Sequence, residues 1–143
     1  MLCWVYPESS AVSGPLFHYT DYNPNAIGGV KLWINSGRLD AHFEESYGIT
    51  TTEPLALNKW HYVGSSYDGN TGMASLWLNG TSVESQNISY ITLATGYNVR
   101  MGEIDGNRFF KGRITAMQVY DVALTAEQIN AVKDAGRGLL AND

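Results

Sequence analysis

Apolar and polar residues alternate with a period of two in most segments of this chain, and turn residues close each segment. Residues 30–34 end at Asn35-Ser36-Gly37, and residues 74–78 end at Asn79-Gly80. Asparagine followed by glycine is the strongest two-residue signal for a β-hairpin. Segments of the same kind lie at residues 1–6, 38–43, 60–67, 83–85, 99–101 and 114–120. Strands about ten residues apart, with turns between them, predict an antiparallel β-sandwich.

One segment near the C-terminus has a helical pattern instead. Thr125 is a suitable N-cap, and Gln128 three residues later completes a capping box. Leu124 and Ile129 flank this box at the spacing of a hydrophobic staple. Gly136 is a suitable residue to end the helix, because glycine readily adopts the left-handed conformation found after many helices. The sequence therefore predicts one short helix between Thr125 and Gly136.

The length and composition agree with one globular domain. The chain has 143 residues, of which 44% are apolar and 16% are charged. A chain of this size buries about 70% of the surface that it exposes when unfolded, so it needs no metal ion or disulfide in order to fold. Its formal net charge of −5 argues against nucleic acid or an anionic membrane as a partner. No apolar run reaches the length that crosses a bilayer, and we therefore expect no membrane insertion.

The first residues already have the pattern of a strand, and no signal peptide is visible. We therefore expect the chain to begin inside its fold, as an excised piece of a longer protein does. Cys3 has no partner for an internal disulfide, and we expect it to be a small buried residue. The alternative is a disulfide to sequence outside this chain. Two sequons, Asn79-Gly80-Thr81 and Asn87-Ile88-Ser89, weakly favour a secreted or extracellular setting.

Three pieces of the sequence, in their order and spacing, resemble a known family. They are Trp60-His61-Tyr62-Val63 leading into Tyr67-Asp68-Gly69, then Leu76-Trp77-Leu78-Asn79-Gly80, then Phe110-Lys111-Gly112-Arg113-Ile114 running on to Thr125. Together they resemble the laminin-G-like and pentraxin-type domains of the concanavalin A-like lectin/glucanase superfamily. The resemblance implies an all-β fold, namely a two-sheet antiparallel jelly-roll sandwich with one short C-terminal helix. It covers nearly the whole chain, so residues 1–143 are expected to form a single domain of this type.

The resemblance also implies a function and a missing strand. The expected function is that of a non-catalytic extracellular recognition module, which binds carbohydrate or protein ligands. The family normally has an extra N-terminal strand ahead of Cys3-Trp4-Val5, and none is seen here. Its absence should leave a sheet edge unpaired, and exposed edges invite pairing with another chain. We therefore expect self-association through that edge, or its cover by the tail beyond Gly138.

Two acidic loops suggest a calcium site. In the pentraxin-like arrangement, a loop between early strands meets the loop after a late strand at one edge of the sandwich. Calcium takes six to eight oxygen ligands, which carboxylate and amide side chains supply. The alternative is two solvated turns that never meet and are stabilised by their own side-chain hydrogen bonds. The expected ligands are Asp21, Asn23, Asn25, Glu103, Asp105 and Asn107.

Aromatic side chains are the other candidates for ligand binding. Trp33, Trp60 and Trp77 lie within predicted strands, where large apolar side chains mostly belong to the core. His61 belongs to the family's strand pattern, and we expect it to have a packing role. Four tyrosines lie near predicted strand ends or loops, where they could stack on a sugar: Tyr19, Tyr22, Tyr47 and Tyr97.

An enzymatic function is the remote alternative. Glu103-Ile104-Asp105 matches the start of a motif of laminarinase-like glycosidases, which share the jelly-roll fold. A retaining glycosidase needs two carboxyl groups about 5–5.5 Å apart. The second glutamate of that motif is missing, since Asn107 and Arg108 stand at its candidate positions. We therefore expect no enzyme. The nearer alternative is a structural or adhesion module that serves as a spacer without a small ligand.

Overall fold

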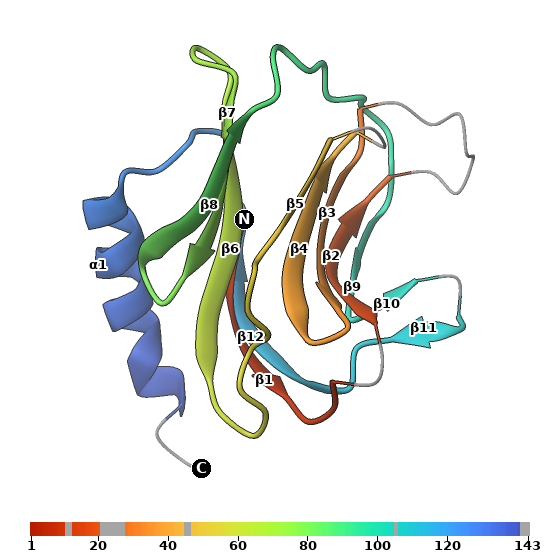
Figure 1. The fold of residues 1–143 in the computed structure, drawn as a ribbon, viewed down its shortest axis with the longest axis vertical. Coiled ribbons are helices and arrows are strands. Elements are labelled where there is room, and N and C mark those ends of the chain that lie inside the picture. The colour runs from red at the N-terminus through yellow and green to blue at the C-terminus, as the bar shows by residue number, and fades with distance from the viewer. Residues whose placement is uncertain (11–12, 21–27, 45–46, 105, 141–143) are drawn as a thin grey trace.

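Two antiparallel sheets of five strands face each other in the computed structural model (Figure 1), which describes residues 1–10, 13–20, 28–44, 47–104 and 106–140. Sheet A has the strand order β12-β1-β6-β7-β8, and sheet B has the order β5-β4-β3-β2-β9. The strands of sheet A are β1 (Leu2–Pro7), β6 (His61–Asp68), β7 (Met73–Leu78), β8 (Thr81–Asn87) and β12 (Gly112–Gln118). Those of sheet B are β2 (Gly14–Tyr19), β3 (Val30–Asn35), β4 (Arg38–Phe43), β5 (Tyr47–Thr50) and β9 (Val99–Met101). The predicted antiparallel sandwich is therefore confirmed.

The core lies between the two sheets, and the period-two alternation of the strands fills it. Cys3 and Val5 of β1 belong to this core and are fully buried, with 0% of their surface exposed. Leu32 and Ile34 of β3 belong to the same cluster on the side of sheet B. Burial raises the pKa of the Cys3 thiol to about 12, so that the thiol stays protonated and unreactive. Cys3 is thus the small buried residue that the sequence predicted.

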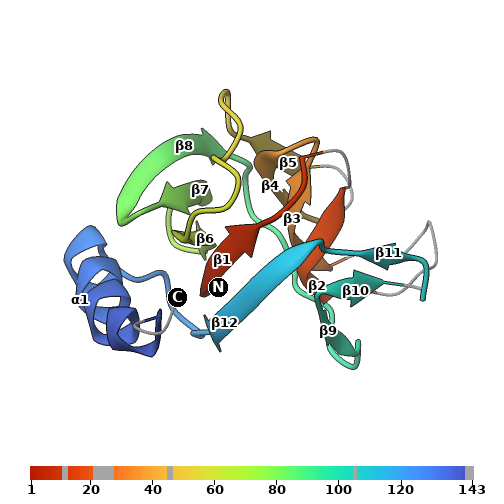
Figure 2. The same ribbon diagram turned by 90° about the horizontal axis from the view of Figure 1, so that it is seen from below.

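The opposite face of sheet A is covered by helix α1 (Ala126–Arg137), which Figure 2 shows beside that sheet. Ile129 of the helix is 1% exposed and packs against Leu2, Trp4 and Tyr62 of the sheet. Leu2 and Trp4 alternate along β1 with residues of the inter-sheet core, so this strand is buried on both sides. The part of sheet A around β1 and β6 therefore lies between α1 and sheet B.

The sequence predicted how α1 begins but not where it ends. Thr125 Oγ1 accepts a hydrogen bond from the Gln128 N–H, and Gln128 Oε1 accepts one from the Thr125 N–H, so the capping box is confirmed. The predicted end at Gly136 is wrong, because the helix continues past it and is capped by Gly138. Gly136 serves close packing instead, since a Cβ at this position would lie 3.0 Å from Nε1 of the Trp4 indole.

Both hairpin turns that the sequence predicted are present. Ser36 and Gly37 have φ angles of 51° and 80°, and Asn79 and Gly80 have φ angles of 53° and 88°. Two successive residues with positive φ are typical of the type I′ turn, whose twist matches that of the flanking strands. The first turn joins β3 to β4, and the second joins β7 to β8.

Four strands escaped the sequence pattern. β2 contains Pro15, and its first five residues are all buried, so it lacks the alternation of a strand with one exposed face. β5 has only four residues, and β10 (Glu103–Ile104) and β11 (Arg108–Phe109) form a hairpin with two residues in each strand. β5 depends on pairing with β4, and the hairpin packs against β2. β5 and the two hairpin strands are too short to show a pattern of their own, and β2, against which the hairpin packs, lies far away in the sequence.

β12 forms one edge of sheet A, beside β1. Within the tail, Gly138–Leu140 form a 3-10 turn, and Leu140 packs against the cluster of Leu2 and Ile129 under α1. The absence of a first strand and self-association through a sheet edge both stay predictions.

Among the described residues, no helix is long and apolar enough to span a membrane.

The turn between β7 and β8 ties α1 to sheet A. Asn130 Nδ2 donates to the Gly80 carbonyl at 2.9 Å, and Lys133 Nζ donates to the Asn79 carbonyl at 3.3 Å. Asn79 Oδ1 accepts a hydrogen bond from the N–H of Tyr62 at 3.0 Å. This one turn therefore connects the helix to β6 in the middle of the sheet.

Replacing Gly80 by alanine is expected to destabilise the fold by about 2 kcal/mol. The new Cβ would sit on a backbone with a φ of 88° and would overlap the Asn130 amide. Urea unfolding of the wild type and of G80A measures the difference. Gly69→Ala is the matched control, because the nearest atom to a Cβ there is Tyr67 Cε1 at 3.8 Å. Equal stability of the two variants would contradict this account of the turn.

Candidate functional site

Sheet B turns one face toward sheet A and the other face away from it (Figure 1). The face that is turned away carries polar side chains on regular strands. The inward positions of β3 and β4 are apolar and buried, so the residues between them point outward. Cross-strand pairing then sets these residues side by side in rows that run from β5 to β9. We call this surface the outer face. Its side chains, with that of the adjoining β11, include His18, Lys31, Trp33, Asp40, His42, Thr50, Arg100 and Arg108.

Trp33 lies in the middle strand of the outer face rather than in the core, where it was expected. Leu32 and Ile34 take the inward positions of β3, so the residue between them must point outward. The Arg108 guanidinium lies over the Trp33 ring, 5.5 Å from its centroid, and the His18 ring meets it edge-on at 6.2 Å between centroids. The Trp33 Nε1–H is buried and has no hydrogen-bond partner among the described residues. The indole is therefore fixed by its neighbours while part of its surface stays exposed.

Asp40 is a buried carboxylate that orders the part of the outer face next to β5. It is 5% exposed, accepts a hydrogen bond from Thr50 Oγ1 at 2.7 Å, and pairs with His42 Nε2 at 3.1 Å. Burial alone would raise the pKa of Asp40, but hydrogen bonds from His42, Thr50 and Asn35 outweigh it and hold that pKa below its ordinary value. Gly48 leaves room for the imidazole, since a Cβ there would lie 3.0 Å from His42 Cε1. The ionised carboxylate thus holds the His42 ring in place.

The other end of the outer face is basic. Arg100 of β9 lies beside His18 of β2 in the strand ladder. Its Nη1 is 3.1 Å from Oε1 of Glu103 in β10. Arg108 projects from the neighbouring β11 toward Trp33. The hairpin of β10 and β11 therefore contributes two charged residues to the outer face. Glu103 pairs with Arg100 of the sheet, and Arg108 lies over the Trp33 ring.

The structure describes only part of the predicted calcium site. Glu103 is paired with Arg100, and Asn107 lies in the turn of the β10–β11 hairpin. β9 pairs antiparallel with β2, so the chain leads from β9 toward the start of β2, whereas Asp21 follows the end of that strand. No group of three or more His, Cys, Asp or Glu side chains suited to a metal ion occurs within the described part of the chain. The site stays a prediction, and Asp21, Asn23, Asn25 and Asp105 lie outside the described residues.

The tyrosines expected to stack on a sugar are not gathered at one place. Tyr19 and Tyr97 contact each other with 5.5 Å between ring centroids, and Tyr19 Oη donates to the Ala94 carbonyl at 2.9 Å. Tyr47 lies in β5, at the opposite edge of sheet B from β9, and packs against the core. Tyr22 lies outside the described residues. That these tyrosines stack on a sugar stays a prediction.

The other aromatic residues singled out in the sequence have packing roles. Trp60 and Trp77 are partly buried against the cluster between α1 and sheet A. His61 is buried, and its Nε2 lies 2.9 Å from the Ala56 carbonyl oxygen. The packing role expected for His61 is therefore confirmed.

A laminin-G-type model of the concanavalin A-like lectin/glucanases superfamily matches residues 1–130. The chain belongs to this superfamily. The family resemblance seen in the three sequence pieces is thereby confirmed. A comparison with curated proteins gives no match.

Solved structures of low sequence identity share the superfamily fold. The CBM40 domain of the Ruminococcus gnavus IT-sialidase, bound to α2,3-sialyllactose, has a TM-score of 0.76 at 20% identity and covers 92% of this chain and 79% of its own. The heptameric SAP-like pentraxin of Limulus polyphemus has a TM-score of 0.69 at 21% identity over 92% of this chain and 67% of its own. A Bacteroides ovatus protein described as carbohydrate-binding has a TM-score of 0.74 at 20% identity over 90% of this chain. The chain spans only 38% of that protein. The jelly-roll class is thereby confirmed.

Asp40→Asn is expected to lower the free energy of unfolding of this superfamily domain near neutral pH. It should also make that free energy fall less than in the wild type as the pH is lowered. A carboxyl group whose pKa is depressed by folding stabilises the fold above its unfolded pKa of about 3.9. This contribution to stability is lost as the pH falls from about 3.9 through the lower pKa that Asp40 has in the folded protein. Urea unfolding from about pH 7 to about pH 2 measures both effects, with Asp134→Asn on the exposed side of α1 as control. Parallel pH curves for D40N and the wild type would contradict the depressed pKa.

Proposed function

We propose that this chain is a non-catalytic carbohydrate-binding module whose glycan lies on the outer face of sheet B. The observation that carries the proposal is the Trp33 ring, which is held on this face beneath the Arg108 guanidinium. Lys31 and His42 flank it on neighbouring positions of β3 and β4 and are partly exposed. An aromatic ring surrounded by hydrogen-bonding side chains matches the two surfaces of a sugar, its apolar C–H face and its hydroxyl groups.

The strands of the outer face supply the rigidity that such recognition needs. Binding groups are held more firmly on strands than on loops, because packing fixes the backbone beneath them. Trp33 and Asp40 stand on strands whose inward residues are among the most buried of the core. His42 is oriented by Asp40, and Arg100 is oriented by Glu103. Little conformational freedom is therefore left to lose when a glycan binds.

The solved structures support a glycan as the ligand. Two of the proteins that share the fold are described as carbohydrate-binding, and one of these is bound to α2,3-sialyllactose. The shared fold does not by itself carry the ligand, since one fold supports many functions. The aromatic and polar composition of the outer face is the independent support from this chain.

The acidic side chains of the outer face support a module without catalysis. Those on its described strands and hairpin are Asp40 of β4 and Glu103 of β10. β4 and β2 are two strand spacings apart, about 9.6 Å, and β10 packs beside β2. The carboxyl pair of a retaining glycosidase is about 5–5.5 Å apart. Each acid is also occupied, Asp40 with His42 and Glu103 with Arg100.

Calcium dependence and an extracellular setting are the finer parts of the proposal. A hard cation prefers carboxylate, amide and carbonyl oxygens, which the two acidic loops offer in their sequences. Asn79 and Asn87 of the two sequons are both exposed, which supports a chain that passes through a secretory compartment. The candidate calcium ligands are Asp21, Asn23, Asn25, Glu103, Asp105 and Asn107.

Trp33→Ala is expected to weaken glycan binding about tenfold or more, as the loss of a buried aromatic anchor does. An array of sialylated, galactosylated and plant glycans first identifies a ligand of the wild type. Calorimetric titration with that ligand then gives the dissociation constants of the wild type and the variant. Tyr90→Ala is the matched control, because Tyr90 is 78% exposed and lies outside the outer face.

Arg108→Gln separates loss of binding from loss of folding. Arg108 is exposed, so its replacement should leave the thermal midpoint nearly unchanged while weakening binding. If W33A and R108Q both bind the array ligand as the wild type does, the glycan does not lie on the outer face. An array without any signal, in calcium and in chelator, would favour the spacer or adhesion module.

Calcium at about 1 mM is expected to raise the thermal midpoint, because an ion that binds only the folded state stabilises that state. Differential scanning fluorimetry in calcium and in chelator measures the shift, and magnesium at the same concentration is the control. Asp105→Ala should reduce the shift. An unchanged midpoint, with D105A and the wild type indistinguishable, would remove the calcium site from consideration.

A further inference from the structure

One row of residues crosses the outer face, with one residue from each strand of sheet B. The strand registers place His42 of β4 beside Lys31 of β3. His18 of β2 lies beside Lys31 on one side and beside Arg100 of β9 on the other. Gly48 of β5 completes the row. None of these described positions holds a carboxylate, and each side chain beyond the glycine carries basic nitrogen atoms. We call it the basic row.

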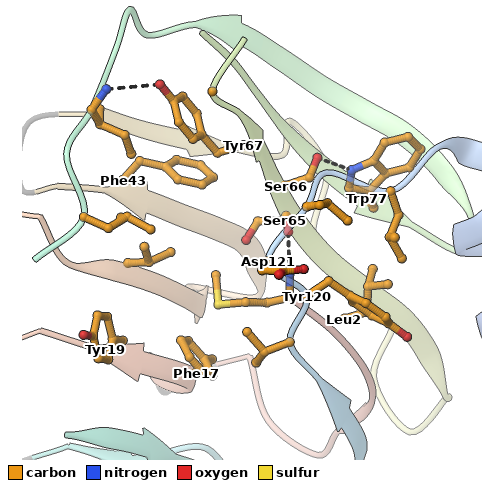
Figure 3. Close-up of a pocket in the computed structure, with 18 of the residues that line it drawn as sticks. Leu2, Phe17, Tyr19, Phe43, Ser65, Ser66, Tyr67, Trp77, Tyr120 and Asp121 are labelled. Atoms are coloured by element: carbon orange, nitrogen blue, oxygen red, sulfur yellow. Dashed lines mark hydrogen bonds between the residues drawn. The ribbon is translucent and has the colours of Figure 1, made fainter. Parts of the chain in front are cut away.

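The basic row is fixed from the inner side of sheet B. Phe17 and Phe43 point the opposite way from the adjacent row residues and line the apolar space between the two sheets (Figure 3). His18 is itself buried, with 1% of its surface exposed. The members of the row whose side chains reach the surface are Lys31, His42 and Arg100.

A further cation borders the exposed part of Trp33. The Arg108 guanidinium lies over the indole ring, 5.5 Å from its centroid, and Arg108 is exposed. A sugar that approaches the indole therefore meets this guanidinium as well. A cation that loses water to a neutral sugar keeps an uncompensated charge, which costs free energy, whereas an anionic group on the sugar offsets that cost. The position of Arg108 thus favours a negatively charged ligand over a neutral one.

Two acidic side chains belong to the described strands and hairpin of the outer face, and each is paired with a base. Asp40 is 5% exposed and pairs with His42. Glu103 pairs with Arg100 Nη1 at 3.1 Å. A guanidinium carries five N–H donors in a planar fork, so Arg100 can bind an anionic ligand while Glu103 orients it. Both acids therefore position bases of the outer face, and neither stands in the basic row.

We propose that the glycan bound on the outer face is acidic, and that its carboxylate or sulfate group lies between Arg108 and the basic row. This inference rests on the proposed function, because it assigns a class of glycan to the same site. Carboxylate and sulfate groups both present several oxygen acceptors, which an arginine fork binds through two parallel hydrogen bonds. Lys31 and Arg100 stand two strand spacings apart, about 9.6 Å. An anionic group above the buried His18 is therefore within reach of both long side chains.

The preference for an acidic glycan depends on this local arrangement, because the chain as a whole carries a net charge of −5. The overall field of the protein therefore does not attract an anion to the outer face. Interactions between exposed charges are screened by salt. Binding of an acidic glycan should accordingly weaken as the ionic strength rises, whereas binding of a neutral glycan should not.

The direct test compares acidic oligosaccharides with neutral counterparts that share their sugar core. The pairs are 3′-sialyllactose and 3′-sulfolactose against lactose, and trigalacturonate against its methyl ester. Calorimetric titration of the wild type should give a dissociation constant about tenfold lower or better for an acidic probe than for its neutral counterpart. Raising NaCl from about 50 mM to about 500 mM should remove most of that difference. The probes with carboxylate and the probe with sulfate show which anionic group is bound.

Substitutions at Arg108 separate its charge from its shape. Arg108→Met keeps an unbranched side chain without the charge, and it should bring the two members of a pair within about threefold of each other. Arg108→Lys keeps the charge without the planar fork and should retain part of the preference. Lys31→Gln and Arg100→Gln should each weaken binding of the acidic probe about tenfold. Thermal midpoints near that of the wild type would show that the variants are folded.

Lys59→Gln is the matched control, because it also removes one exposed positive charge. Lys59 precedes β6 of sheet A and lies outside the outer face, so the preference for the acidic probe should be unchanged.

Several results would overturn the proposal. Neutral counterparts that bind as tightly as the acidic probes would leave the proposed glycan site standing without an acidic ligand. A preference that persists in R108M, K31Q and R100Q alike would place the anionic group elsewhere on the protein. A preference that disappears in chelator but persists in R108M would assign that group to a bound metal ion. Absence of binding by every probe, together with a silent glycan array, would remove the proposed function as well.

Discussion

Burial of β1, an interior strand of sheet A, on both of its faces is the constraint on which the rest of this fold depends. In β1, Cys3 and Val5 lie under sheet B, whereas Leu2 and Trp4 lie under α1. Each large apolar side chain buried in this way stabilises the fold by about 1.5–3 kcal/mol. The strand cannot shift without exposing apolar surface on two sides. The helix is far from β1 in the sequence, yet it belongs to the support of the sheet. Within the described part of the chain, the outer face of sheet B carries mainly polar side chains.

Local signals in the sequence predicted the parts of the fold that are decided locally. The Asn79–Gly80 turn and the capping box at Thr125 each depend on residues within four positions of one another, and both are present. β2 depends on partners on both sides, β3 and β9, and nothing within its own six residues reveals them. Gly136 has the identity of a helix terminator but contacts Trp4, which lies at the other end of the chain. The sequence could not show that contact.

The outer face was missed for a different reason. Its residues are visible in the sequence, but the direction in which each points depends on the phase of the alternation. Once Leu32 and Ile34 are inward, Trp33 must be outward, and the same argument places Asp40 and His42. Trp33 was predicted to lie in the core because its side chain is large and apolar. The neighbours of Trp33 also come from separate segments, since Arg108 reaches it from a hairpin of four paired residues. The net charge of the whole chain also gives no sign of the basic residues on this face: Arg100 on β9, Arg108 on β11 and Lys31 on β3, three strands that all contact β2.

Alternation along β2 and β4 separates the two sides of sheet B. Phe17 and Phe43 belong to the core between the sheets, while the adjacent His18 and His42 point to the outer face. The packing of the phenylalanines fixes the two strands, and the strands fix the directions of the histidines. Recognition on the outer face therefore falls to side chains whose directions are set by the packing of the core behind them.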